Sequence, residues 1–76
     1  MTRIQKVETL DDYQLHVFFD NGNHVILNMK SKINTVRFSL LSDPEYFKEV
    51  TTDGHFIKWH NQVEISVSEI FQLAQK

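Results

Sequence analysis

Phe19-Asp20-Asn21-Gly22 stands between two runs in which apolar and polar side chains alternate. An Asn-Gly pair flanked by such runs is a strong short-range signal for a β-hairpin, because both residue types tolerate the left-handed backbone of tight turns. The alternating apolar positions are Tyr13, Leu15, Val17 and Phe19 before the turn, and Val25, Leu27 and Met29 after it. The pattern predicts an antiparallel sheet with one buried face.

The same pattern selects the length of the hairpin loop. A two-residue loop would leave Leu15 facing Asn28, so that apolar residues of one strand meet polar residues of the other. A three-residue loop with Gly22 left-handed, next to a bulge, sets Val17 opposite Val25 and keeps the strong apolar residues on one face. We therefore expect the three-residue loop.

Two short motifs predict helices. In Ser42-Asp43-Pro44-Glu45, Ser or Asp caps the helix, proline fits its first turn, and the glutamate favours its positive end. Ser66-Val67-Ser68-Glu69 matches a capping box, in which the serine and the glutamate satisfy each other's backbone amides. The helix that follows places Val67, Ile70, Phe71 and Ala74 along one stripe.

Further short strands are expected at 4–7, 50–52, 56–59 and 63–65, with irregular structure at 30–42. We predict a single α+β domain over residues 1–76. Its architecture is a small antiparallel sheet of about four to five strands, a short middle helix, and a C-terminal helix packed on the sheet.

Composition limits the classes of function. The chain has no cysteine, which excludes disulfides and thiolate metal sites. Its formal charge is −2 with acids and bases interleaved, and it lacks the basic stripe typical of nucleic-acid binders, which argues against nucleic acid as a partner. A basic face would need Arg3, Lys6, Lys30 and Lys32 together. With no signal peptide and no apolar run of about 18 residues, we expect a cytoplasmic protein with no membrane partner.

Motifs for catalysis are missing from the sequence. Both glycines, Gly22 and Gly54, are assigned to turns, which leaves no phosphate-binding loop and no Gly-x-Ser-x-Gly elbow. His16 and His24 lie diagonally on the solvent side of the hairpin, with backbones about 7–8 Å apart, near the reach of a shared metal. The plainer interpretation is two surface histidines. We predict no catalytic residue, no metal and no cofactor.

Two features predict an interaction surface. Phe18 and Ile26 lie on the face opposite the predicted core, where an antiparallel sheet normally presents polar side chains. They indicate a docking site for a partner protein or a second copy, unless the segment 31–41 covers them. The second feature is the corner of Trp59, His60 and Glu64, in which Trp59 fits either the core or the rim of a binding site.

A second class of function uses the same corner of the chain. A pocket around Trp59, His60 and Glu64, with His55 near it, would suit a small ligand or a minor enzyme. A neutral histidine beside a carboxylate is a general base in many enzymes. The interaction module and this pocket are kept as alternatives.

The order of the motifs resembles the small bacterial proteins of the domain of unknown function 2442 family. The resemblance runs from about Ile4 to about Phe71 and rests on the Phe-x-Asn-Gly hairpin, the stretch 38–47 (Phe-Ser-Leu-Leu-Ser-Asp-Pro-Glu-Tyr-Phe), Ile57-Lys58-Trp59, and Glu64-Ile65 before a helix. The family pattern has Pro and Gly after the tryptophan, where this chain has His60 and Gln62.

What the resemblance implies is a fold rather than a reaction. It implies an antiparallel sheet with a packed C-terminal helix and no established activity. Family members often stand beside another small protein, which suggests one half of a two-protein pair of the toxin–antitoxin kind. Together with the missing catalytic motifs, this makes a non-catalytic protein-interaction module our leading interpretation.

Overall fold

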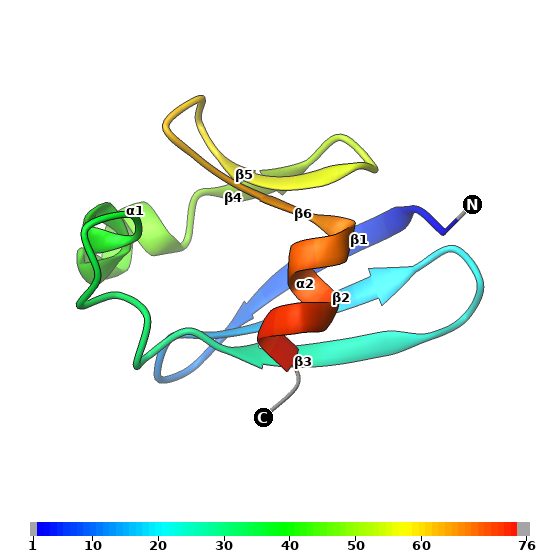
Figure 1. Cartoon of the computed structure of the whole chain (residues 1–76), viewed down its shortest axis with the longest axis horizontal. Coiled ribbons are helices and arrows are strands. Elements are labelled where there is room, and N and C mark those ends of the chain that lie inside the picture. Colours follow the sequence, from blue (N-terminus) through cyan, green and yellow to red (C-terminus); the bar gives the residue numbers. More distant parts are fainter. Residues whose placement is uncertain (1, 75–76) are drawn as a thin grey trace.

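A computed structural model describes residues 2–74 of the chain. Figure 1 shows two sheets with a short helix crossing in front of one of them. The elements are β1 (Ile4–Leu10), β2 (Gln14–Phe19), β3 (His24–Asn28), a 3-10 turn η1 (Ser39–Ser42), α1 (Pro44–Phe47), β4 (Val50–Thr52), β5 (Phe56–Trp59), β6 (Val63–Ser66) and α2 (Val67–Ala74).

The strands form two antiparallel sheets of three, ordered β1-β2-β3 and β4-β5-β6. We call them the first and the second sheet. The α+β class is confirmed, but the expected single sheet of about four to five strands is corrected. Strand β4 lies near β1, and the Ile4 amide donates to the Gly54 carbonyl at 2.8 Å. Among residues 2–74, this bond does not continue into a ladder between β1 and β4, because β4 is only three residues long and leads into the 53–55 turn.

The hairpin register is confirmed. Val17 lies opposite Val25, and Leu15 opposite Leu27. The Phe19 amide donates to the Asn23 carbonyl at 2.8 Å and closes a loop of three residues. Gly22 has φ +89°, a left-handed conformation that a side chain would strain.

Both predicted helices begin at the expected caps. The Asp43 carboxylate accepts a hydrogen bond from the Glu45 amide at 3.0 Å, and Pro44 is the first residue of α1. Ser66 Oγ accepts from the Glu69 amide at 3.2 Å, which is one half of the predicted capping box. The carboxylate of Glu69 is instead taken by Arg37, 32 positions away in sequence.

The core fills the space between the two sheets and under α2. In α2, Ile70 is fully buried and Phe71 stacks on Phe19 of β2, with ring centroids 5.2 Å apart. The fully buried large side chains are Trp59, Phe19, Leu15, Leu27, Met29, Leu41, Ile57, Ile65, Ile70 and Val17. The C-terminal helix therefore packs on the inner face of the first sheet, as predicted.

Trp59 belongs to this core and not to a rim. Its exposed fraction is 0%, and its indole Nε1 donates to the Phe47 carbonyl at 2.9 Å. The alternation of β5 explains the placement, since Ile57 and Trp59 point inward while Phe56 points out. Among residues 2–74, none of the helices has the length and apolar character needed to cross a bilayer.

Candidate interaction surface

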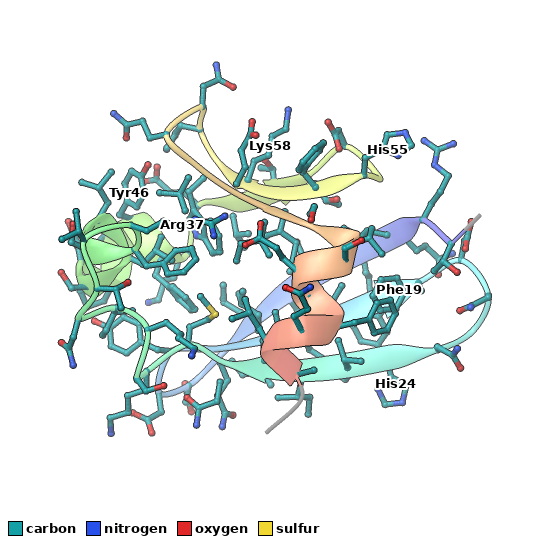
Figure 2. All side chains as sticks on the ribbon, in the orientation of Figure 1. Phe19, His24, Arg37, Tyr46, His55 and Lys58 are labelled. Carbon is teal, nitrogen blue, oxygen red and sulfur yellow. The ribbon has the colours of Figure 1, made fainter. Side chains whose placement is uncertain are left out.

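The outer face of the first sheet is the side turned away from α2. In Figure 2, Phe19 points toward α2 whereas His24 points away from it, as the alternation of the strands requires. The residues of this face, in three cross-strand rows, are Lys6, Phe18 and His24, then Glu8, His16 and Ile26, then Leu10, Gln14 and Asn28.

No helix or loop among residues 2–74 covers this face. Ile26 is 53% exposed and Leu10 is 37% exposed. The segment 31–41, which was kept as an alternative cover, lies at the end of the molecule that holds η1 and α1 (Figure 1). The outer face therefore combines apolar side chains with access to solvent.

A cluster of rings occupies the centre of the outer face. His16 Nε2 and His24 Nδ1 are 2.9 Å apart, so one ring donates the hydrogen bond and the other accepts it. The ring of Phe18 stacks on His16 at 4.1 Å, and Lys6 Nζ lies 4.7 Å from the Phe18 centroid. Phe18 is half-buried by these neighbours. We call Lys6, His16, Phe18 and His24 the ring cluster.

The cluster offers stacking and hydrogen-bonding groups rather than a full set of metal ligands. Two imidazoles are fewer than the three protein ligands of a typical catalytic zinc site. Within residues 2–74 the structure holds no group of three or more histidine or acidic side chains able to bind a metal. The cluster instead presents flat aromatic faces, one cation and one shared imidazole proton.

The predicted pocket residues Trp59, His60 and Glu64 do not converge. Trp59 is buried, whereas Glu64 is exposed and lies opposite Lys58 on the far side of the second sheet. His60 occupies the turn after β5 with φ +57°, and its Nε2 pairs with Glu49 Oε1. The histidine thus has a carboxylate partner, but a different one from the residue that the sequence suggested.

One ion pair between distant segments was not predicted from the sequence. Arg37 donates from Nη1 to Glu69 Oε2 at 2.5 Å, and from Nη2 to Glu69 Oε1 at 2.9 Å and to the Glu64 carbonyl at 2.8 Å. The hydrogen bonds from Arg37 lower the pKa of Glu69, and the same bonds raise the pKa of Arg37. Arg37 therefore ties the long connection between the sheets to the start of α2.

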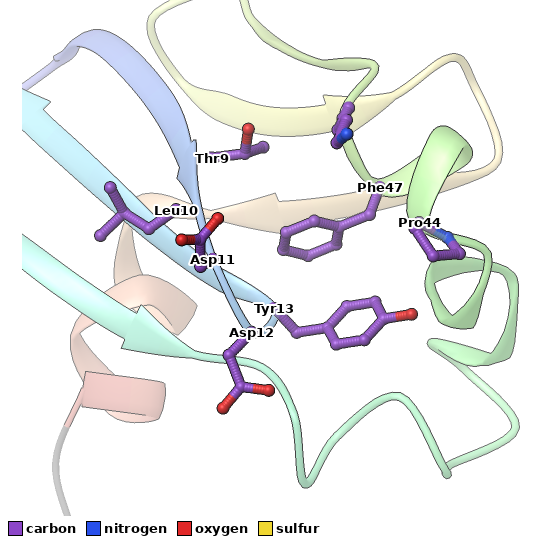
Figure 3. Close-up of a pocket in the computed structure, with 8 residues that line it drawn as sticks. Thr9, Leu10, Asp11, Asp12, Tyr13, Pro44 and Phe47 are labelled. Carbon is purple, nitrogen blue, oxygen red and sulfur yellow. The ribbon is translucent and has the colours of Figure 1, made fainter.

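Two cavities lie elsewhere on the surface. One, of about 330 Å³, is lined by the 9–13 turn and by Pro44, Phe47 and Lys48 (Figure 3). Two of the lining residues, Asp12 and Tyr13, have positive φ, of 63° and 62°. The other, of about 640 Å³, includes His55, Phe56 and Phe71. The second cavity thus contains one residue of the predicted pocket, His55, but neither cavity is lined by Trp59, His60 or Glu64.

Comparisons with known proteins identify a fold neighbour and no family. No protein-family model matches the chain, and neither does any curated protein. The chain is similar to the crystal structure of "Putative DNA Binding Protein NE0471 from Nitrosomonas europaea ATCC 19718", with a TM-score of 0.81 and 19% sequence identity. The match covers 99% of this chain and 50% of that one, so this chain spans about half the length of its neighbour. At this identity the likeness shows the fold.

The neighbour corrects one prediction. The interleaved charges led us to argue against nucleic acid as a partner, but a chain of the same fold carries the description "Putative DNA Binding Protein". Charge pattern was a weak basis, because a local basic or aromatic surface can exist on a chain whose net charge is negative. The prediction against nucleic acid is withdrawn.

Proposed function

We propose that this chain is a non-catalytic protein-interaction module whose binding surface is the outer face of the first sheet. The observation that carries the proposal is the exposure of Ile26 at 53%, beside Phe18, on a sheet face without cover from residues 2–74. An antiparallel sheet with one buried face usually turns polar side chains to water. Apolar side chains gathered on the other face mark a docking site.

The rigidity of the surface supports the same function. His16 and His24 hold each other by a hydrogen bond, and Phe18 is stacked between His16 and Lys6. Side chains that are already ordered lose little conformational entropy when a partner binds. The ring cluster is thus suited to act as an anchor, with Ile26 as the accessible apolar contact next to it.

We also propose that the partner is another small protein, which makes this chain one half of a two-protein pair of the toxin–antitoxin kind. The neighbour of the same fold is about twice as long as the matched part, so there the module is joined to a further segment. An exposed apolar side chain such as Ile26 on an uncovered sheet face is a surface that a small protein partner would bury. The enzymatic alternative has less support, since Trp59, His60 and Glu64 are apart.

The test is a capture experiment with a matched control. Tagged wild type, Ile26→Asp and Val36→Asp are expressed at native level in the source organism, and retained proteins are quantified by mass spectrometry. Val36 is 95% exposed and lies off the outer face, so it controls for the added charge. We expect a stoichiometric protein that Ile26→Asp loses and Val36→Asp keeps. Equal recovery with all three baits would remove the outer face as the binding surface.

Nucleic-acid binding by the ring cluster is the second candidate. Phe18, His16 and His24 offer stacking surfaces beside the cation of Lys6, the combination on which single-stranded bases stack. The description of the fold neighbour favours this candidate as well. Fluorescence anisotropy with labelled single- and double-stranded oligonucleotides at about 50 and 200 mM salt tests it. Binding that weakens with salt and with Phe18→Leu would support it, and flat titrations would dismiss it.

A further inference from the structure

We propose that the free edge of β3 pairs with the same edge of a second copy, giving one continuous sheet with three strands from each chain. The two β3 strands run antiparallel about a two-fold axis at Ile26. This inference goes beyond the proposed function, because its partner is a second copy and its surface is the edge of β3, which shares Ile26 with the outer face. It adds a geometry that the outer face alone does not specify.

The backbone of β3 has unpaired groups along its outer edge. Phe19 and Asn23 form a hydrogen-bonded pair, and in an antiparallel ladder such pairs alternate along the strand. The N–H and C=O groups of His24, Ile26 and Asn28 therefore point away from β2. Within residues 2–74 no hydrogen bond from another segment reaches these groups. The edge is a ready template for another strand.

The edge also lacks the devices that normally prevent such pairing. Its sequence, His-Val-Ile-Leu-Asn, contains no lysine, acid or proline, and its pairing with β2 has no bulge. Strand β1, at the opposite edge of the first sheet, carries Lys6 and Glu8, a register shift between Ile4 and Lys6, and β4 as a neighbour. One edge is protected and the other is open.

Self-complementarity identifies a second copy as the occupant. Centring the axis on Ile26 brings this side chain against the second copy's Ile26 and sets His24 opposite the second copy's Asn28. Three residue pairs then exchange about six hydrogen bonds. No like charges meet, and every outward backbone group of β3 finds a partner. A two-fold interface requires this kind of surface, one that complements itself.

The side chains around the edge fit the same arrangement. On the outer face, Ile26 is the most exposed apolar residue of the first sheet, and pairing would bury it against its own copy. On the inner face, Val25 of β3 and Leu73 of α2 pack against the core but stay half-buried. The strand added by a second copy would extend both faces. Because the edge is short, we expect a weak dimer with a Kd on the order of 100 µM.

Complementary charges at the two-fold axis test the register directly. Ile26→Lys and Ile26→Glu each place like charges opposite one another in a homodimer, so we expect the dimer to weaken by about tenfold or more. An equimolar mixture of the two variants should dimerise again, because lysine then faces glutamate. Val36→Lys is the control that adds the same charge off the edge. Sedimentation equilibrium from about 10 µM to about 1 mM measures the wild type, the three variants and the mixture.

The outcomes separate this inference from the proposed function. A dimer that either Ile26 variant breaks and the mixture restores would establish the pairing. Wild type that stays monomeric to about 1 mM, or a dimer insensitive to Ile26, would overturn it, whatever the capture experiment shows. As an independent readout, amide exchange of Ile26 should slow with rising wild-type concentration while that of Val36 does not. Circular dichroism of each variant verifies that the fold is retained.

Discussion

Trp59→Phe should destabilise the protein strongly, because Trp59 lies in the core and uses both its ring and its indole N–H. The indole Nε1 donates to the Phe47 carbonyl at 2.9 Å, and phenylalanine leaves that carbonyl without its partner, at a cost of about 1–3 kcal/mol. The smaller ring also loses buried area and leaves a void, which costs about 1–2 kcal/mol. Together we expect a loss of about 3 kcal/mol in the free energy of unfolding.

The assay is equilibrium unfolding followed by far-UV circular dichroism, since the variant has no tryptophan fluorescence. For a domain of this size, about 3 kcal/mol corresponds to a fall in Tm of about 12–24 °C. Phe56→Leu is the matched control, because Phe56 lies on the same strand, faces outward and is 37% exposed. It should lose less than about 1 kcal/mol. A loss below about 0.5 kcal/mol for Trp59→Phe would refute the placement of Trp59 in the core.

Three further predictions concern local structure and pH. Gly22→Ala should lower the free energy of unfolding by about 1 kcal/mol, because alanine is strained at the φ of +89° found there. No atom lies within 4 Å of the added Cβ, so no steric clash adds to this cost. An unchanged midpoint of chemical denaturation would contradict the left-handed turn. Ser66→Ala should cost about 1 kcal/mol through loss of the α2 cap, and Ser68→Ala much less. Hydrogen bonds from the His55 and Phe56 amides and from Lys58 lower the pKa of Asp53 from 3.8 to about 2. The stabilisation from Asp53 is therefore complete above pH 3.8 and lost as the pH falls toward about 2, so the stability gap between wild type and Asp53→Asn should close over that window.

The parts of the fold that were predicted correctly depend on neighbours in sequence. The three-residue loop at Gly22 and the pairing of Val17 with Val25 follow from alternation and turn chemistry within about fifteen residues. The cap of α1 at Asp43 and the Ser66 half of the capping box are likewise local. Each of these features requires particular residue types at neighbouring positions, so it can be predicted from the sequence.

The parts that were missed depend on contacts between distant segments. The division into two sheets depends on how the 30–49 connection folds, and that connection has no clear period. Arg37 and Glu69 are 32 positions apart, and no sequence pattern predicts that these two residues form an ion pair. The sequence pattern allowed Trp59 to lie in the core or at a rim. The Phe47 carbonyl, which accepts a hydrogen bond from its indole, shows that Trp59 lies in the core. Phe18 and Ile26 were placed correctly on the outer face, because alternation shows which face a strand residue occupies, and their role in binding stays a prediction.

The position of α2 after the strands in the sequence sets the order in which the first sheet and its covering helix can form. The first sheet consists of residues 4–28, whereas the helix that covers its inner face is formed by residues 67–74. On a ribosome, the hairpin leaves the exit tunnel with Val17 and Phe19 uncovered until α2 has also left the tunnel. That interval exposes the apolar face of β2 together with the open edge of β3, so the nascent chain is most prone to aggregate just before α2 emerges. Shortening that delay, for example by moving the α2 sequence ahead of β1 in a circular permutant, should raise the soluble yield.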